Sequence, residues 1–241
     1  MQEISVLASR VLTSQRRYDT VADNVANLNT SGYRKLELEF QETISRPSNK
    51  ATASYVSDRA VHVSQQQGDM EATNNPFDVA IGGEGFFAID VNGTTQYTRR
   101  GQFVVNNEGI LVTPEGNPVL DNGGAQIQIP QNSKTVTIAG DGAISSEAGQ
   151  IGQMGVYTFS PADMKKLERA GTSAFIPMLG AAAVPMENAR VRQGFLEGSN
   201  AKATEEMVNM QMVSKAYETS LKLLKGMEDL ESQAIRSLGT Q

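Results

Sequence analysis

The apolar residues at the two ends of the chain recur with the spacing of amphipathic helices. Near the N-terminus they follow alternating steps of three and four, with Ser14 in the one gap: Ile4, Leu7, Val11, Tyr18, Val21, Val25 and Leu28. Near the C-terminus they follow the same rule, with a stutter near residue 226: Met207, Met210, Tyr217, Leu221, Leu224, Ile235 and Leu238. The pattern predicts a long helix at each end, and each helix carries a coiled-coil-like seam.

In the middle of the chain the apolar period changes to two. The alternation predicts strands at residues 86–91, 102–105, 110–113, 126–129, 135–138 and 156–159. Turn signals such as Asn92-Gly93 separate them, and 14 of the 22 glycines lie within residues 82–155. One short helix is expected, with Ser160 as N-cap, Pro161 at its first position and Gly171 beyond its end.

These patterns predict an α+β fold, in which a mainly antiparallel β domain is inserted between N- and C-terminal coiled-coil-like helices. Residues 35–75 are polar and weakly periodic, so an extended connector with at most one strand or helical turn is expected there. The predicted divisions are an N-terminal assembly helix and turn (1–34), the connector (35–75), a β-rich domain with one short helix (76–196), and a C-terminal assembly helix that pairs with the first (197–241).

The composition narrows the classes of function. The 241 residues carry a net charge of −6 with a sequence pI near 5.0, which argues against a general nucleic-acid binder. Because there is no cysteine and one histidine, His62, the sequence excludes thiolate catalysis and multi-histidine metal sites. No stretch approaches the roughly 18 apolar residues of a membrane helix, and residues 1–20 lack the apolar run of a cleaved leader. No cofactor, metal, nucleic-acid partner or membrane insertion is therefore expected.

Two short motifs raise the alternative of an enzyme that acts on carbohydrates or nucleotides. "GEGFFA" (83–88) matches the dinucleotide fingerprint, but a strand pattern follows where the fingerprint needs a helix. "GDG" (140–142) lacks the further ligands of a calcium loop. A glycine turn between strands and isolated surface carboxylates explain these motifs better than catalysis does.

The end of the first helix carries three carboxamides in "DNVANLNTSGYR", residues 23–34. Asn24 and Asn27 lie beside the apolar seam, and Asn29 follows them. Buried amides beside a seam fix register and partner, because a misaligned pairing leaves them unsatisfied. Gly32 can supply the left-handed turn that redirects the chain. A helix cap with surface amides is the alternative. Since the first helix alone is only marginally stable, its seam needs a partner.

Four blocks, found in the expected order, resemble the flagellar basal-body rod and hook protein family. "NVANLNTSGY" (24–33) resembles the family's N-terminal signature, and "NPFDVAIGGEGFF" (75–87) resembles the segment that opens its β domain. "YTRRGQFVVNNEGILVTPEGNPVL" (97–120) and "GFLEGSNAKATEEMVNMQMVSKAYE" (194–218) resemble two further signatures. Arg100 stands where an Asp is common, and Lys215 replaces the usual Arg. The short connector favours a proximal-rod member, and a distal-rod or hook subunit is the alternative.

The resemblance implies a structural subunit without enzymatic activity. Such proteins leave the cell through the flagellar type III export apparatus without a cleaved signal peptide, and they assemble with themselves and with other proximal- and distal-rod proteins in the rod that crosses the periplasm. Their paired terminal helices form the inner tube of a helical assembly that transmits torque. The expected assembly residues are Leu7, Val11, Tyr18, Val21, Asn24, Val25, Asn27, Leu28, Asn29 and Gly32 near the N-terminus, with Glu197, Gly198, Ser199, Asn200, Met207, Met210, Tyr217, Leu221 and Leu224 near the C-terminus.

Overall fold

The computed structural model describes residues 2–45, 53–133 and 135–238, which form two compact units. Unit 1 comprises Met1–Ala26, Leu36–His62 and Lys202–Gln241, and unit 2 comprises Asn27–Lys35 and Val63–Ala201. Helices near both termini flank an antiparallel β-rich region, so the predicted α+β class is confirmed. The domain boundaries differ from the predicted ones, because residues 27–35 belong with the β-rich unit and most of the expected connector belongs with the helices.

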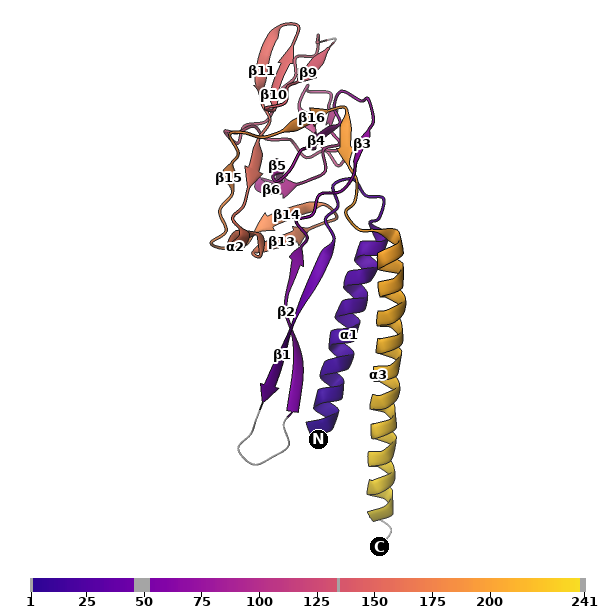
Figure 1. Ribbon diagram of the computed structural model, residues 1–241. Helices are drawn as coiled ribbons and strands as arrows, with labels where there is room; N and C mark the ends of the chain where they lie inside the picture. Colours follow the sequence, from indigo (N-terminus) through magenta and orange to yellow (C-terminus); the bar gives the residue numbers. More distant parts are fainter. Residues whose placement is uncertain (1, 46–52, 134, 239–241) are drawn as a thin grey trace. The chain divides into compact units, whose positions relative to one another are not determined.

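Unit 1 contains two long helices and two long strands: α1 (Gln2–Ala26), α3 (Ala203–Leu238), β1 (Leu36–Ser45) and β2 (Ala53–Val63), the last of which ends in unit 2. Helices α1 and α3 lie side by side, and β1 contacts α1 (Figure 1). Strands β1 and β2 pair in a two-stranded sheet. The expectation of at most one strand in residues 35–75 was therefore wrong.

The half-buried face of α3 follows a regular three-and-four spacing through Met210, Val213, Tyr217, Ser220, Leu224 and Met227. This spacing runs through residue 226 without a change of phase, so the predicted stutter is absent as far as Met227. The predicted Met207 and Leu221 lie outside this face, since their side chains are 56% and 39% exposed. The side chains of Ile235 and Leu238 lie outside the described residues. The pattern of apolar residues therefore predicted the helix correctly, but it assigned Met207 and Leu221 to the wrong face of that helix.

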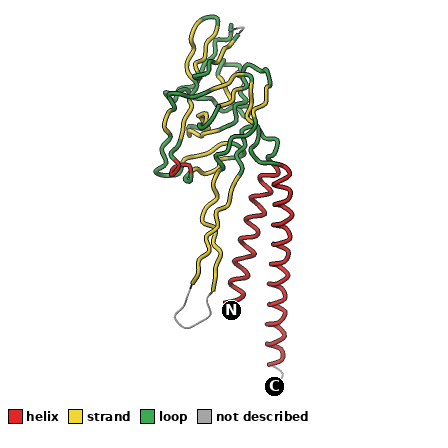
Figure 2. The backbone as a smooth tube through the Cα atoms, in the orientation of Figure 1, coloured by secondary structure: helices red, strands yellow, loops and turns green. Residues whose placement is uncertain are grey.

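Unit 2 is built from short antiparallel strands (Figures 1 and 2). Its largest sheet has six strands in the order β13-β14-β6-β5-β12-β15, and a three-stranded sheet has the order β11-β10-β9. Three strand pairs, β16-β4, β17-β3 and β7-β8, complete it. The elements are β3 (Met70–Ala72), β4 (Val79–Ile81), β5 (Phe86–Val91), β6 (Thr94–Thr98), β7 (Val104–Val105), β8 (Leu111–Val112), β9 (Val136–Ile138), β10 (Ala143–Ser146), β11 (Gly149–Gln153), β12 (Val156–Thr158), α2 (Pro161–Met164), β13 (Leu167–Ala170), β14 (Ala174–Pro177), β15 (Val184–Pro185), β16 (Val191–Gln193) and β17 (Phe195–Glu197).

The β5–β6 hairpin forms the centre of the large sheet. Its two-residue turn is the predicted Asn92-Gly93, and both residues have positive φ (54° and 81°), as a type I′ turn requires. Strand β5 supplies Phe87, which is fully buried and meets Phe103 edge to face at 5.3 Å between ring centroids. The apolar core of unit 2 thus lies around the strand whose bounds the sequence predicted.

Several local predictions need correction. Residues 126–129 make only isolated bridges, because Gln126 and Gln128 pair with single residues of other loops. The short helix begins as predicted, with Ser160 Oγ accepting a hydrogen bond from Asp163 N, but it ends at Met164. Gly171 instead lies in the turn between β13 and β14, where its φ is +70°.

Gly32 and Gly171 provide a matched pair for testing the turn after α1. Both have a left-handed backbone, with φ of +69° and +70°. A Cβ on Gly32 would lie 2.3 Å from Arg100 N, whereas a Cβ on Gly171 would meet nothing within 4 Å. We expect Gly171→Ala to lower the free energy of unfolding by about 1–2 kcal/mol, the cost of the backbone conformation alone. Gly32→Ala should cost clearly more in calorimetry of the full chain, and equal losses would contradict the predicted backbone collision.

Candidate functional site

A buried carboxylate joins three segments that are far apart in the sequence. Glu197, at the end of β17, is 1% exposed. Its Oε1 lies 2.9 Å from a terminal nitrogen of Arg34, and its Oε2 lies 2.6 Å from Nε of Arg99. Both arginines are also buried. Each carboxylate oxygen therefore receives its own guanidinium group, and Gly68 N donates a further hydrogen bond to Oε1 at 3.2 Å.

Backbone carbonyls accept the other hydrogen bonds of the two arginines. Arg99 donates to the carbonyls of Ile81 (2.9 Å), Gly83 and Gly85, and Arg34 donates to those of Gln65 (2.8 Å) and Gln66. Burial lowers the pKa of Arg34 to about 10 and also lowers that of Arg99, while the charge of Glu197 acts in the opposite direction. Because a pKa of about 10 lies well above neutrality, Arg34 stays charged at neutral pH.

Asn200 ties this ion cluster to the ends of the unit 2 segments. Its Oδ1 accepts from Lys35 N at 2.6 Å, its Nδ2 donates to Gln66 O at 2.7 Å, and its backbone N donates to Tyr33 O at 3.3 Å. We call Arg34, Arg99, Glu197 and Asn200 the junction cluster. Its hydrogen bonds and ion pairs connect segments of unit 2 that lie close to the positions where the chain passes from one unit to the other. These positions are between residues 35 and 36, 62 and 63, and 201 and 202.

The turn after α1 is part of the same arrangement. Gly32 N donates to Glu197 O at 2.7 Å, and Tyr33 N donates to Thr30 O at 3.2 Å. The guanidinium of Arg169 lies 4.4 Å from the centre of the Tyr33 ring, and Tyr33 itself has no exposed surface. Gly32 thus supplies the predicted left-handed turn, and it does so against the backbone of Glu197.

The C-terminal signature residues predicted as assembly elements lie around this cluster. Glu197 and Asn200 are its centre, Gly198 N donates to Asp69 O at 2.8 Å, and Ser199 Oγ accepts from Ala201 N at 3.2 Å. Sequence reasoning missed Arg34 and Arg99, although both stand in or beside the quoted signature blocks. An arginine is usually exposed, so only the match to the blocks could have singled them out.

The three carboxamides of the first block have different environments. Asn24 is 2% exposed in unit 1, where its Oδ1 accepts from Leu36 N at 2.9 Å and its Nδ2 donates to Leu36 O at 3.1 Å. The same Nδ2 lies 3.5 Å from the buried carboxylate of Glu206 on α3. Asn27 is half-buried and accepts from Thr30 Oγ1 at 3.1 Å, and Asn29 is exposed. Asn24 thus joins α1, β1 and α3 within one chain.

The predicted seam residues divide into two groups. Half-buried positions are Leu7, Val11, Val21, Val25 and Leu28 near the N-terminus, with Met210, Tyr217 and Leu224 on α3. Tyr18, Met207 and Leu221 are 40%, 56% and 39% exposed. Where side chains of unit 1 are described, those that are buried are polar: Thr20, Asn24 and Glu206. The helices of unit 1 are therefore covered far less completely than the core of unit 2.

The described residues contain no group of three or more acidic, histidine or cysteine side chains that could hold a metal ion. Among the same residues, no helix combines the length and the apolar character needed to cross a membrane. The site that the described residues do form is a network of internal ion pairs and hydrogen bonds, which fixes segments of unit 2 in place.

In comparisons with known proteins, the chain matches three family models, which together cover more than half of its residues. They are described as flagella basal body rod protein (residues 4–34), flagellar hook protein FlgE/F/G D1 domain (80–146) and flagellar basal body rod FlgEFG protein C-terminal (192–237). Arg34, Arg99 and Glu197 come from these three regions in turn.

Similar full-length proteins carry the same description. Flagellar basal-body rod protein FlgF of Caulobacter vibrioides is 35% identical over 96% of this chain and 95% of its own length. FlgF of Mesorhizobium japonicum is 35% identical over 98% and 97%, and the rod protein FlgG of Borreliella burgdorferi is 32% identical over 95% and 96%. The chain therefore belongs to the flagellar basal-body rod and hook protein family. It is a structural subunit of the basal-body rod, which assembles with other rod and hook proteins, and it is not an enzyme.

Glu197→Gln tests the ion cluster while it keeps the shape of the side chain. The change leaves two buried guanidinium groups without their counter-charge, so we expect the free energy of unfolding to fall by about 3–5 kcal/mol. The matched control is Glu115→Gln, which breaks the partly exposed ion pair with Arg100 and should cost about 1 kcal/mol or less. Calorimetry of the full chain measures both. Similar losses in the two variants would mean that the buried cluster contributes no more than a surface pair.

Asn24→Ala and Asn27→Ala test which amide holds α1. Removing the Asn24 side chain leaves the N–H and C=O of Leu36 without their partner, which should cost about 1–3 kcal/mol. Asn27→Ala removes an acceptor in a half-buried turn and should cost about 1 kcal/mol or less. Hydrogen exchange of the α1 and β1 amides, read separately from unit 2, measures the difference. Faster exchange in the Asn27 variant than in the Asn24 variant would reverse the assignment.

Proposed function

We propose that the chain is a proximal-rod subunit of the FlgF type, which polymerises through its terminal helices into a helical tube that crosses the periplasm and transmits torque. The observation that carries the proposal is that three family-matched regions each give one charged residue to the junction cluster. A distal-rod or hook subunit of the same family is the alternative. The similarity to FlgF relatives and the short segment between Tyr33 and β3 favour the proximal rod.

Torque transmission requires that load is shared between the two units of one subunit. The chain passes between the units four times, after Ala26, Lys35, His62 and Ala201. Hydrogen bonds of the junction cluster link the unit 2 segments next to these passages, and a further bond runs from Ser64 N to Lys35 O at 2.9 Å. Since force applied to one segment is resisted by all the segments bound to it, such a cluster distributes load that a single linker would carry alone. This arrangement suits a rigid mechanical part.

Coiled-coil-like pairing of α1 and α3 is the second part of the proposal. The half-buried three-and-four spacing on α3 supports it, and the buried Asn24 beside the seam supplies a register-fixing polar contact. Further large apolar side chains remain exposed on another face of α3: Val208, Met212, Leu223 and Leu230, which are 49–67% exposed. A helix that is apolar on more than one face is typical of a helix with more than one packing partner. We infer that neighbouring subunits cover this second face.

The family supports the partners and the location that we propose. The chain would contact copies of itself and other proximal- and distal-rod proteins, and it would reach the periplasm through the flagellar type III export apparatus. The apolar side chains of the unit 1 helices are only partly buried, and this fits the export route. Helices that are packed by neighbouring subunits need not be stably folded before assembly.

Leu223→Lys tests assembly through α3. The side chain is 53% exposed, so the variant should keep the monomer's thermal unfolding while its charge prevents packing against a neighbour. In a strain without the native gene, we expect loss of motility and of the chain from isolated basal bodies. Gln211→Lys places the same side chain at an exposed polar position of the same helix and should assemble normally. A motile strain with Leu223→Lys in its basal bodies would contradict assembly through this face, and absence of the unmodified chain from basal bodies would contradict the function itself.

A further inference from the structure

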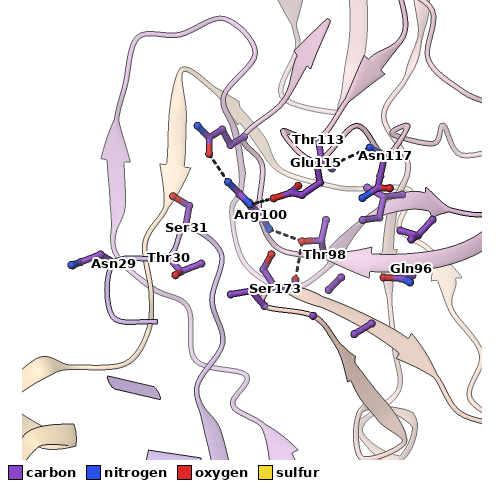
Figure 3. A pocket seen from close by; sticks show the side chains of 17 residues that line it. Asn29, Thr30, Ser31, Gln96, Thr98, Arg100, Thr113, Glu115, Asn117 and Ser173 are labelled. Carbon is purple, nitrogen blue, oxygen red and sulfur yellow. Dashed lines mark hydrogen bonds and ion pairs between the residues drawn. The ribbon is translucent and has the colours of Figure 1, made fainter. Parts of the chain in front are cut away.

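A hollow of about 750 Å³ lies on one face of the β5–β6 hairpin in unit 2 (Figure 3). Ile89 and Gln96 of the hairpin line it, together with the turn that contains Asn29 and Ser31 and the loop that contains Asn117. The segments that line it overlap two signature blocks, 24–33 and 97–120. None of the signature residues that line the hollow belongs to the junction cluster.

Several polar groups of the hollow have no partner in the folded chain. Among the described residues, the side chains of Asn29, Ser31, Gln96 and Asn117 make no hydrogen bond. A carboxamide both donates and accepts, so three of these groups match the alternating N–H and C=O groups of a peptide backbone. The lining contains no aromatic ring, which is the platform that sugar and nucleobase sites use. The chemistry of the hollow therefore fits a protein segment.

The charge of the hollow is already balanced. Arg100 and Glu115, which line it, form an ion pair at 2.5 Å between Nη1 and Oε1, and Arg100 also donates to Gln102 Oε1 at 3.0 Å. A segment that carries charge would therefore find no unpaired opposite charge among the residues that line the hollow. The hollow thus favours an uncharged segment with an apolar side chain that can contact Ile89 and Val91.

Unit 2 itself presents a segment with these properties. Met178, Leu179 and Val184 are 52%, 103% and 54% exposed, and they are three of the four large apolar side chains exposed in the described part of unit 2. Residues 171–186 contain no charged side chain. Ala181 N donates to Met178 O at 3.0 Å and Gly180 has a φ of +86°, so a tight turn presents Leu179 at its tip. Lys166 Nζ donates to Gly180 O at 3.3 Å and holds the turn in place.

The turn and the hollow lie at opposite ends of strand β14. Ala174, the first residue of the strand, lines the hollow, and Met178 follows its last residue, Pro177. A strand of this length extends about 13 Å, so the turn and the hollow are separate parts of the surface of unit 2. We propose that Leu179 of one copy of this chain occupies the hollow of the next copy. This contact is heterologous, so its repetition generates a ring or a helix, as the proposed rod subunit, on which this inference rests, requires.

Cysteine cross-linking tests the contact in the full chain, which has no cysteine of its own. The variant that combines Leu179→Cys with Gln96→Cys should give disulfide-linked dimers and larger species in isolated basal bodies after mild oxidation. The control combines Gln96→Cys with Ala148→Cys, at the exposed turn between β10 and β11. We expect at least tenfold more cross-linked product in the first pair than in the control, and none from any single variant.

Three outcomes would overturn the inference: no dimer in assembled basal bodies, equal yields in the two pairs, or a disulfide formed within one chain. These leave the proposed function intact, because the chain is then still found in the basal body. If the chain is absent from basal bodies, the proposed function fails instead. The cross-link is then measured on the concentrated purified chain, where a dimer specific to the first pair supports the contact and its absence overturns it.

Discussion

The burial of one carboxylate between two guanidinium groups is the interaction on which unit 2 depends. Taking three charges out of water is costly, and the cost is offset only where each charged atom keeps a partner. Glu197 meets Arg34 and Arg99 through separate oxygens, and the arginines use backbone carbonyls for further bonds. Because these residues stand more than 60 positions apart along the chain, no local segment can form the cluster by itself. The turn after α1, the segment after β6 and the C-terminal signature must therefore be brought together before the cluster can form.

The two units are stabilised by different means. Unit 2 has a fully buried apolar core around Phe87 and Phe103, whereas the buried side chains described in unit 1 are the polar Thr20, Asn24 and Glu206. Polar contacts such as the two hydrogen bonds between Asn24 and Leu36 fix the register of the helix and strand, but they add little net free energy. Unit 1 is therefore the part of the subunit whose stability can increase most when neighbours cover its remaining apolar surface.

The sequence predicted the features that local chemistry determines. The helices follow from the three-and-four spacing, β5 from its apolar run, and the hairpin from Asn92-Gly93, whose two residues are suited to positive φ. Strand β1 was missed although Leu36, Leu38 and Phe40 alternate with polar residues, because the intervening glutamates made the segment look like a solvated connector. Met207 and Leu221 were assigned to the seam because apolar character does not show which of two apolar faces packs inside one chain. Arg34 and Arg99 were missed because the burial of a charge depends on tertiary partners that no local pattern contains.

A subunit of a polymer must keep surfaces for its neighbours without binding indiscriminately before assembly. On α3 the exposed charged residues Lys215, Glu218 and Lys222 lie between the exposed Met212 and Leu223 in sequence. These charges oppose nonspecific association, while a neighbour of the correct shape can leave them in water and cover the apolar side chains. The junction cluster meets the opposite requirement, because it places its charges where no neighbour has access. The same residue types thus serve two purposes in this chain: where they are buried they fix the subunit's shape, and where they are exposed they restrict which surfaces can join.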